Sequence, residues 1–163
     1  MVASPSGKDS AAMNISRYKI WLVTGASLGC LAVAFGAFGA HGLESAFKNQ
    51  ATNQELGEQQ IAAKLANWET AARYQMYHAL ALLGVGILTA RRCTLAVNIA
   101  GVAFTLGVLI FSGCLYALVL SGQRWLGAIV PIGGTLLIVG WVCLLVAAFQ
   151  DTNVPAGPGG HVE

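Results

Sequence analysis

The sequence predicts an all-α integral membrane protein, a four-helix bundle, from the amount and the placement of its charge. Of the 163 residues, 56% are hydrophobic and 10% are charged, whereas about a quarter of a soluble domain is charged. Four stretches carry no charge at all: residues 20–43, 74–90, 93–123 and 125–150, which hold 24, 17, 31 and 26 residues. A helix needs roughly 20 mostly apolar residues to cross a bilayer. Four buried helices of a soluble protein would leave too little polar surface to dissolve so small a chain.

The four spans are expected at residues 20–40, 71–90, 95–120 and 125–149. The second charge-free stretch is short, and its span therefore takes in Ala71 and Ala72. Together the spans form one membrane domain over residues 20–149. An N-terminal extension over residues 1–19 precedes it, and a Pro- and Gly-rich flexible tail over residues 150–163 follows it.

Between the first two spans lies the one sizeable polar segment. Residues 48–54 look like a loop, and a helix is expected from about Glu55 to Arg73. Apolar residues then recur on one helix face, at Ile61, Leu65, Trp68 and Ala72. Such an amphipathic helix either lies on the membrane surface or runs into the second span. Glu58 to Leu83 contains no Gly or Pro, which favours one continuous helix.

An even number of spans places both termini on one side of the membrane. That side carries Arg17, Lys19, Arg91 and Arg92 close to span ends. The other side carries lysines and arginines that are mostly offset by acids in a longer segment. Lys and Arg near span ends favour the inner side, so the termini are predicted to face the cytoplasm or the matrix.

Several function classes find no support in the sequence. A net charge of +2 without a basic, aromatic-rich patch gives no sign of nucleic-acid binding. The four cysteines form no Cys-x-x-Cys pair and have no histidine at a zinc-site spacing. No Ser/His/Asp order, phosphate loop or His-Glu-x-x-His motif is present. We therefore expect no enzymatic activity, no catalytic residues, no metal and no cofactor.

The strongest candidate site is a polar cluster around two histidines. His41 ends the first span on the side where His78 begins the second, which predicts a similar depth for both, with Glu69, Arg73 and Tyr77 nearby. Ionisable groups in spans suggest function, and such a pair could hold a haem iron, bind a quinone or relay a proton. Alternatively, each histidine only satisfies a backbone carbonyl near the interface. The second, structural interpretation is preferred.

Arg91 and Arg92 form a second candidate site, for lipid. Two arginines in a tight turn suit the phosphates of an anionic lipid such as cardiolipin. The same pair also helps to set the topology. Both interpretations stay open, because one pair can do both.

Five short runs in one order point to a known family. They are Ala34–Leu43, the Glu69–Ala81 segment with Tyr74-Gln75 and His78, Arg91-Arg92, Phe111–Tyr116 and Pro131–Gly134. Over about residues 20–149 the chain resembles the transmembrane protein 256 family, whose bacterial members are classed as a domain of unknown function, number 423. The resemblance implies a four-helix membrane protein without an established reaction, in the mitochondrial inner membrane of eukaryotes or the plasma membrane of bacteria.

Small-residue faces on several helices predict close packing in a membrane. They are marked by Gly25, Gly29, Gly36, Gly101, Gly107, Gly133 and Gly140. With no catalytic set present, the sequence predicts a non-catalytic accessory or structural subunit of a larger membrane complex, respiratory by association with similar small proteins. Its partners would be the bilayer, anionic lipid and other subunits, not nucleic acid. The alternative is a small membrane protein that binds a quinone or haem, or moves protons, through His41 and His78.

Overall fold

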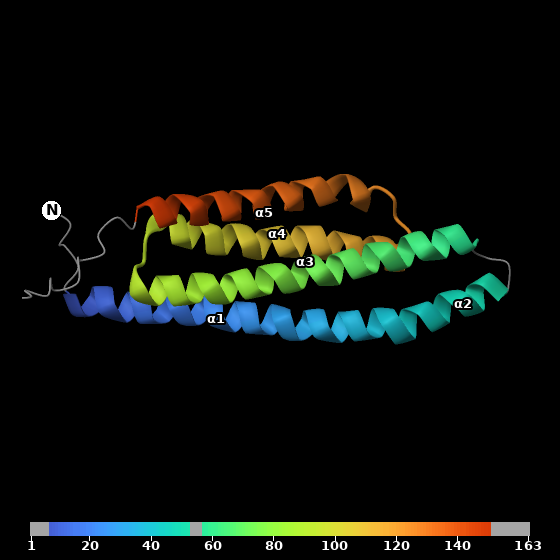
Figure 1. Cartoon of the computed structure of the whole chain (residues 1–163), viewed down its shortest axis with the longest axis horizontal. Coiled ribbons are helices and arrows are strands. Elements are labelled where there is room, and N and C mark those ends of the chain that lie inside the picture. Colours follow the sequence, from blue (N-terminus) through green and yellow to red (C-terminus); the bar gives the residue numbers. More distant parts are fainter. Residues whose placement is uncertain (1–6, 53–56, 151–163) are drawn as a thin grey trace, which may run out of the picture.

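The computed structural model describes residues 7–52 and 57–150, and four long helices dominate it (Figure 1). In chain order the elements are α1 (Gly7–Phe38), the π-helix η1 (Gly39–Leu43), α2 (Glu44–Thr52), α3 (Glu58–Arg91), α4 (Leu95–Ser121) and α5 (Leu126–Phe149). Helix α1 packs along α3, α3 along α4, and α4 along α5. The predicted all-α fold is confirmed.

Within the described residues, three helical segments are long and apolar enough to cross a membrane: Arg17–Phe47, Leu95–Ser121 and Leu126–Phe149. Helix α3 is not one of them, and its segment 71–90 contains the polar residues Arg73, Gln75 and His78. Its segment 71–90 lies between α1 and α4, so the fourth span stays a prediction with this position in its favour.

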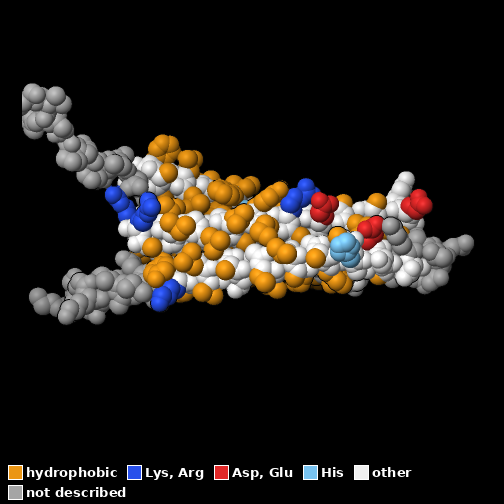
Figure 2. Space-filling model, turned by 60° about the horizontal axis from the view of Figure 1, so that its bottom comes forward, with side chains coloured by type: hydrophobic (Ala, Val, Ile, Leu, Met, Phe, Trp, Pro, Cys, Tyr) orange, Lys and Arg blue, Asp and Glu red, His pale blue; other side chains and the backbone are white. Residues whose placement is uncertain are grey.

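The distribution of side chains over the surface fits a membrane protein. Hydrophobic side chains cover the middle of the face drawn in Figure 2. Lys and Arg gather at one end of that face, and charges of both signs with a histidine lie toward the other end. An apolar band flanked by charge is what a bilayer with two polar interfaces requires.

The antiparallel helices bring the start of α1, the α3–α4 turn and the end of α5 to one end of the molecule (Figure 1). The segment η1–α2, the start of α3 and the α4–α5 turn lie at the other end. This arrangement is the one that an even number of spans requires.

The helices extend beyond the expected spans, and one expected loop is wrong. Helix α1 begins at Gly7, so residues 7–19 of the predicted N-terminal extension are helical. The chain also stays helical through η1 and α2 to Thr52, where a loop was expected over residues 48–54. Extending an existing helix avoids the cost of nucleation, and Glu44–Thr52 contains no Gly or Pro. Residues 1–6, 53–56 and 151–163, with them Glu55 and nearly all of the expected tail, lie outside the described residues.

Helix α3 confirms the continuous helix predicted from the polar segment into the second span. Its apolar face packs on protein, because Ile61 and Trp68 are buried in a cluster with Leu43, Phe47 and Val119. The alternative of a helix lying free on the membrane surface is therefore wrong. A second cluster joins α3, α4 and α5; it contains Leu82, Val85, Val97, Ala100, Phe104, Val108 and Leu137.

Most of the predicted small-residue faces pack inside the chain. A Cβ atom at Gly25 would lie 2.8 Å from the carbonyl oxygen of Ala79, and one at Gly133 would lie 2.5 Å from the backbone nitrogen of Phe111. Such close approach of backbones is how membrane helices gain contact without a hydrophobic driving force. Gly36 differs, because a Cβ there would meet nothing within 4 Å.

Replacing Gly133 by Ala should destabilise the protein, since the new methyl group meets backbone of α4 that cannot move aside cheaply. We expect Gly133→Ala to lower the free energy of unfolding by about 1–3 kcal/mol. The matched control is Gly113→Ala in α4, where the new methyl group meets open space and gains up to about 1 kcal/mol of helix propensity. Thermal unfolding in detergent measures both; equal effects would contradict the close α4–α5 packing.

Cysteine labelling tests the topology. In a background without native cysteines, Ser10→Cys in α1 and Gln150→Cys after α5 should react from the same side of the membrane, because both lie at one end of the bundle. Gln123→Cys in the α4–α5 turn should react only from the opposite side. Labelling of Ser10→Cys and Gln150→Cys from different sides would mean an odd number of spans.

Candidate functional site

The two histidines of the predicted cluster do not meet. His41 is exposed in η1, at the level where Gly39 packs against Trp68. His78 lies one turn beyond Gln75, whose amide contacts the backbone of Leu28. Along α1 and η1, the distance from Leu28 to His41 is about 20 Å at the usual rise per residue. The expectation of similar depth is wrong, because α3 begins well before its expected membrane segment and packs first against η1 and α2, and only then along α1.

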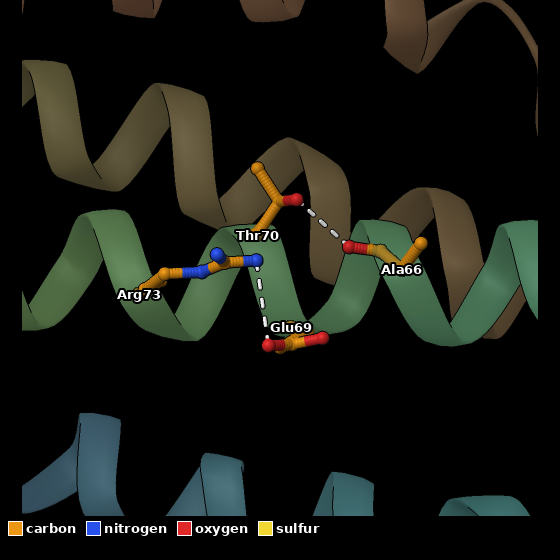
Figure 3. Close-up of polar contacts among 4 residues, drawn as sticks. All are labelled: Ala66, Glu69, Thr70 and Arg73. Atoms are coloured by element: carbon orange, nitrogen blue, oxygen red, sulfur yellow. Dashed lines mark hydrogen bonds and ion pairs between the residues drawn. The ribbon is translucent and has the colours of Figure 1, made fainter.

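The charged members of the cluster lie on the surface of α3. Glu69 and Arg73 form an ion pair of 3.4 Å between exposed side chains, and Thr70 donates a hydrogen bond to the carbonyl of Ala66 (Figure 3). An exposed pair of this kind contributes little stability. Tyr77 is also exposed and has the ring of Tyr74 beside it. These residues therefore do not surround His78.

His78 itself is buried and uses both ring nitrogens. The indole Nε1–H of Trp141 in α5 donates to its Nε2 at 3.2 Å. Since indole can only donate, Nε2 accepts, and the proton lies on Nδ1, which donates to the carbonyl of Tyr74 at 2.8 Å. A haem iron or another metal would have to displace one of these bonds. The geometry favours the structural interpretation of His78.

Gln75 lies at the centre of the polar interior. Its Nε2 donates to the carbonyl of Leu28 in α1 at 2.8 Å. Its Oε1 accepts a hydrogen bond of 3.1 Å from the hydroxyl of Tyr116 in α4. One buried amide thus connects three helices.

Two further bonds extend this connection toward the η1 end. The Nε1–H of Trp68 donates to the carbonyl of Phe35 in α1 at 2.7 Å. The hydroxyl of Ser112 in α4 donates to the carbonyl of Ala71 at 2.8 Å. Helix α3 therefore forms hydrogen bonds with α1, α4 and α5.

Sequence reasoning singled out His78 but missed Gln75, Ser112 and Trp141. The signal was available for Gln75, because an amide inside a charge-free stretch must find a partner in the protein. The sequence does not give the register between the helices, and this register decides which group becomes the hydrogen-bond partner of Gln75.

The turn between α3 and α4 gathers positive charge. Arg91 ends α3 and Arg92 follows it, and both are exposed. Arg17 of α1 reaches the same turn, with its Nη1 at 3.8 Å from the sulfur of Cys93. The predicted pair is therefore joined by a third arginine.

A groove with a volume of about 190 Å³ lies between the α1–α2 region and α3. Small and apolar residues form most of it, and two carboxylates belong to it; the lining residues are Gly36, Gly39, Ala40, Glu44, Leu65, Trp68, Glu69 and Ala72. Of the predicted cluster, Glu69 alone lines this groove.

Residues 7–52 and 57–150 contain no group of three or more His, Cys, Asp or Glu side chains that could hold a metal ion. The four cysteines, Cys30, Cys93, Cys114 and Cys143, are free thiols on different helices or turns.

The helices and their polar interior define a small multi-span helical membrane protein. Over residues 35–134 the chain matches the family described as protein of unknown function DUF423. It is 42% identical over 135 residues to a UPF0382 membrane protein of Staphylococcus saprophyticus, covering 81% of this chain and 98% of that protein. A UPF0382 membrane protein of Staphylococcus aureus is 41% identical over 132 residues, covering 81% and 97%. The chain belongs to the DUF423 family, as its resemblance implied; no solved structure matches it.

These relatives bear on the location of the protein. They are membrane proteins by name and come from bacteria. With three helices able to cross a membrane, an integral protein of a bacterial plasma membrane is supported.

The bond between His78 and Trp141 should contribute measurably to stability. Trp141→Phe and His78→Leu each remove it, and a double-mutant cycle should give a coupling energy of about 0.6 kcal/mol, as is usual between membrane helices. Unfolding in detergent by chemical denaturant measures the cycle. Tyr77→Phe is the control, because its exposed ring takes no part in the bond. Additive effects of the two substitutions would contradict the bond.

Proposed function

We propose that this protein is a non-catalytic subunit of a larger membrane assembly. The supporting observation is the outward face of α1, where Ser27, Cys30, Ala34 and Ala37 are all exposed. Their spacings of three, four and three residues put them on one helix face. Small residues on a membrane helix let a second helix approach closely, so this face suits a protein partner.

Helix α5 provides the contrast. Its outward face carries the bulky residues Ile138, Val142, Leu145 and Phe149, all exposed. Such side chains are as apolar as lipid tails and need no protein partner. The two faces therefore differ. These residues of α5 suit lipid, whereas the small residues of α1 suit another helix, although α1 also exposes Val23, Leu31 and Val33.

The glycines themselves do not provide such a face. Gly25, Gly107 and Gly133 already pack against neighbouring helices of the same chain. They explain how the bundle holds together and leave no free face for a partner. The outward face of α1 is therefore the surface that we propose contacts a partner.

The finer identity expected from the sequence, a respiratory complex in the mitochondrial inner membrane, rests on association alone. The bacterial relatives favour a plasma membrane, and their names assign no complex. Proteins that co-purify under mild detergent would identify the assembly.

The alternative based on His41 and His78 loses its geometric basis. One histidine is exposed at an end of the bundle, and the other is buried with both ring nitrogens bonded. A pair at different depths cannot hold one haem iron. The visible spectrum of purified protein tests this; a Soret band that disappears in His78→Ala would restore the alternative.

Anionic lipid is the partner we propose for Arg91 and Arg92. Arg17 lies at the same turn through its contact with Cys93, which adds to the positive charge beside the membrane. Arginine binds phosphate with planar, paired hydrogen bonds. Cardiolipin, with two phosphates, would suit this charge.

Enlarging the small face of α1 tests the assembly. Ala34→Leu should detach the protein from its partners, because the added atoms keep the helices apart. Blue-native electrophoresis after mild solubilisation should show the unaltered chain far above its own 16.9 kDa and Ala34→Leu near the size of the free chain. The matched control is Ala148→Leu on α5, also exposed, which should stay in the large band. Migration of the unaltered chain as a monomer would refute the proposal.

A further inference from the structure

We propose that the groove between η1 and α3 binds the head group of a phospholipid that carries a primary ammonium, of the ethanolamine class. The inference concerns a different surface from the outward face of α1. It follows from the shape of the groove, its depth in the membrane and the charges that line it.

The groove exists because small residues stand where side chains would fill it. Gly36 has no atom within 4 Å of the place its Cβ would occupy, and Ala40 and Ala72 add only methyl groups. Gly39 packs against the edge of the Trp68 indole, which keeps η1 close to α3 beside the opening. The resulting space of about 190 Å³ is open to the side and suits a compact group with its acyl chains outside.

The depth of the groove fits a lipid head group. Its α1 side belongs to the apolar segment Arg17–Phe47, near the end of that segment. On the α3 side, Ala72 lies at the beginning of the span predicted over residues 71–90, with Glu69 just before this span and Arg73 in its first turn. Figure 2 shows charged side chains of both signs where the apolar band gives way to this end. The groove therefore lies at the boundary between acyl chains and water.

The charges select the head group. Glu44 and Glu69 line the groove, and two carboxylates favour a cation. The Nη2 atom of Arg73 lies 3.4 Å from Oε1 of Glu69, so a guanidinium lies next to one of the two carboxylates. An ammonium between the carboxylates and a phosphate against Arg73 would match this order of charges, with charge-assisted hydrogen bonds at both ends.

A primary ammonium fits better than the other common head groups. It donates three hydrogen bonds, whereas the quaternary ammonium of a choline lipid has no N–H and is larger. An anionic head group without an ammonium would face two carboxylates. The proposal therefore predicts selectivity for ethanolamine lipids over choline lipids of the same acyl chains.

Native mass spectrometry of the purified full chain in detergent, with phosphatidylethanolamine or phosphatidylcholine added, tests this selectivity. We expect the ethanolamine lipid to bind about tenfold more tightly, the difference that one charge-assisted hydrogen bond makes. Gly36→Leu should fill the groove and remove that preference. Gly84→Leu is the matched control. A side chain at this position of α3 also enters open space, but Gly84 does not line the groove.

The charges are tested separately. Glu44→Gln with Glu69→Gln should reduce binding of the ethanolamine lipid about tenfold or more, while Glu58→Gln, exposed on α3 outside the groove, should not. Equal binding of both lipids, or a preference unchanged in Gly36→Leu, would overturn the site. Dodecylamine, which lacks a phosphate, distinguishes the source of the ammonium. If it binds as tightly as the lipid and Arg73→Gln has no effect, the groove takes simple amines and the phospholipid assignment is wrong.

Discussion

The hydrogen bonds of α3 are the interactions on which the rest of this structure depends. In lipid a polar group without a protein partner is costly, and α3 places Trp68, Gln75 and His78 along its buried side. Their partners lie on all three neighbouring helices: Trp68 and Gln75 bond to α1, Gln75 also to α4, and His78 to α5. Because α1 and α5 share no extensive interface within the described residues, α3 together with α4 sets where both outer helices lie.

Close backbone packing makes these bonds reachable. Gly133 brings α5 onto the backbone of α4, and Gly25 brings α1 onto α3. With so much of the glycine content used inside, the surfaces left for function are few. They are the small-residue face of α1, the arginines at the α3–α4 turn and the groove beside η1.

The π-helix η1 explains why one run of the sequence stands out. The family resemblance rests partly on Ala34–Leu43, and this run contains all of η1. A π-turn inserts one extra residue and often marks a functional position. Here the π-helix leaves His41 exposed, and the backbone carbonyl of His41 accepts a hydrogen bond from the hydroxyl of Ser45. It also places Gly39 against the indole of Trp68. The run therefore shapes the groove, and His41 lies outside its lining.

The sequence by itself determined the helical class, the membrane setting, the continuous α3 and the family, because charge-free length and apolar periodicity are local properties. It could not determine which residues face each other, since that depends on the register and rotation of packed helices. One expectation failed for this reason: His41 and His78 were placed at a similar depth. The sequence left open whether the glycines pack within the chain or against a partner, and most of them pack within the chain. The same register created what the sequence did not show, the link from Gln75 to Leu28 and Tyr116 and the groove that brings Glu44 near Glu69. Tertiary structure decided these because each joins side chains from helices that are far apart in the chain.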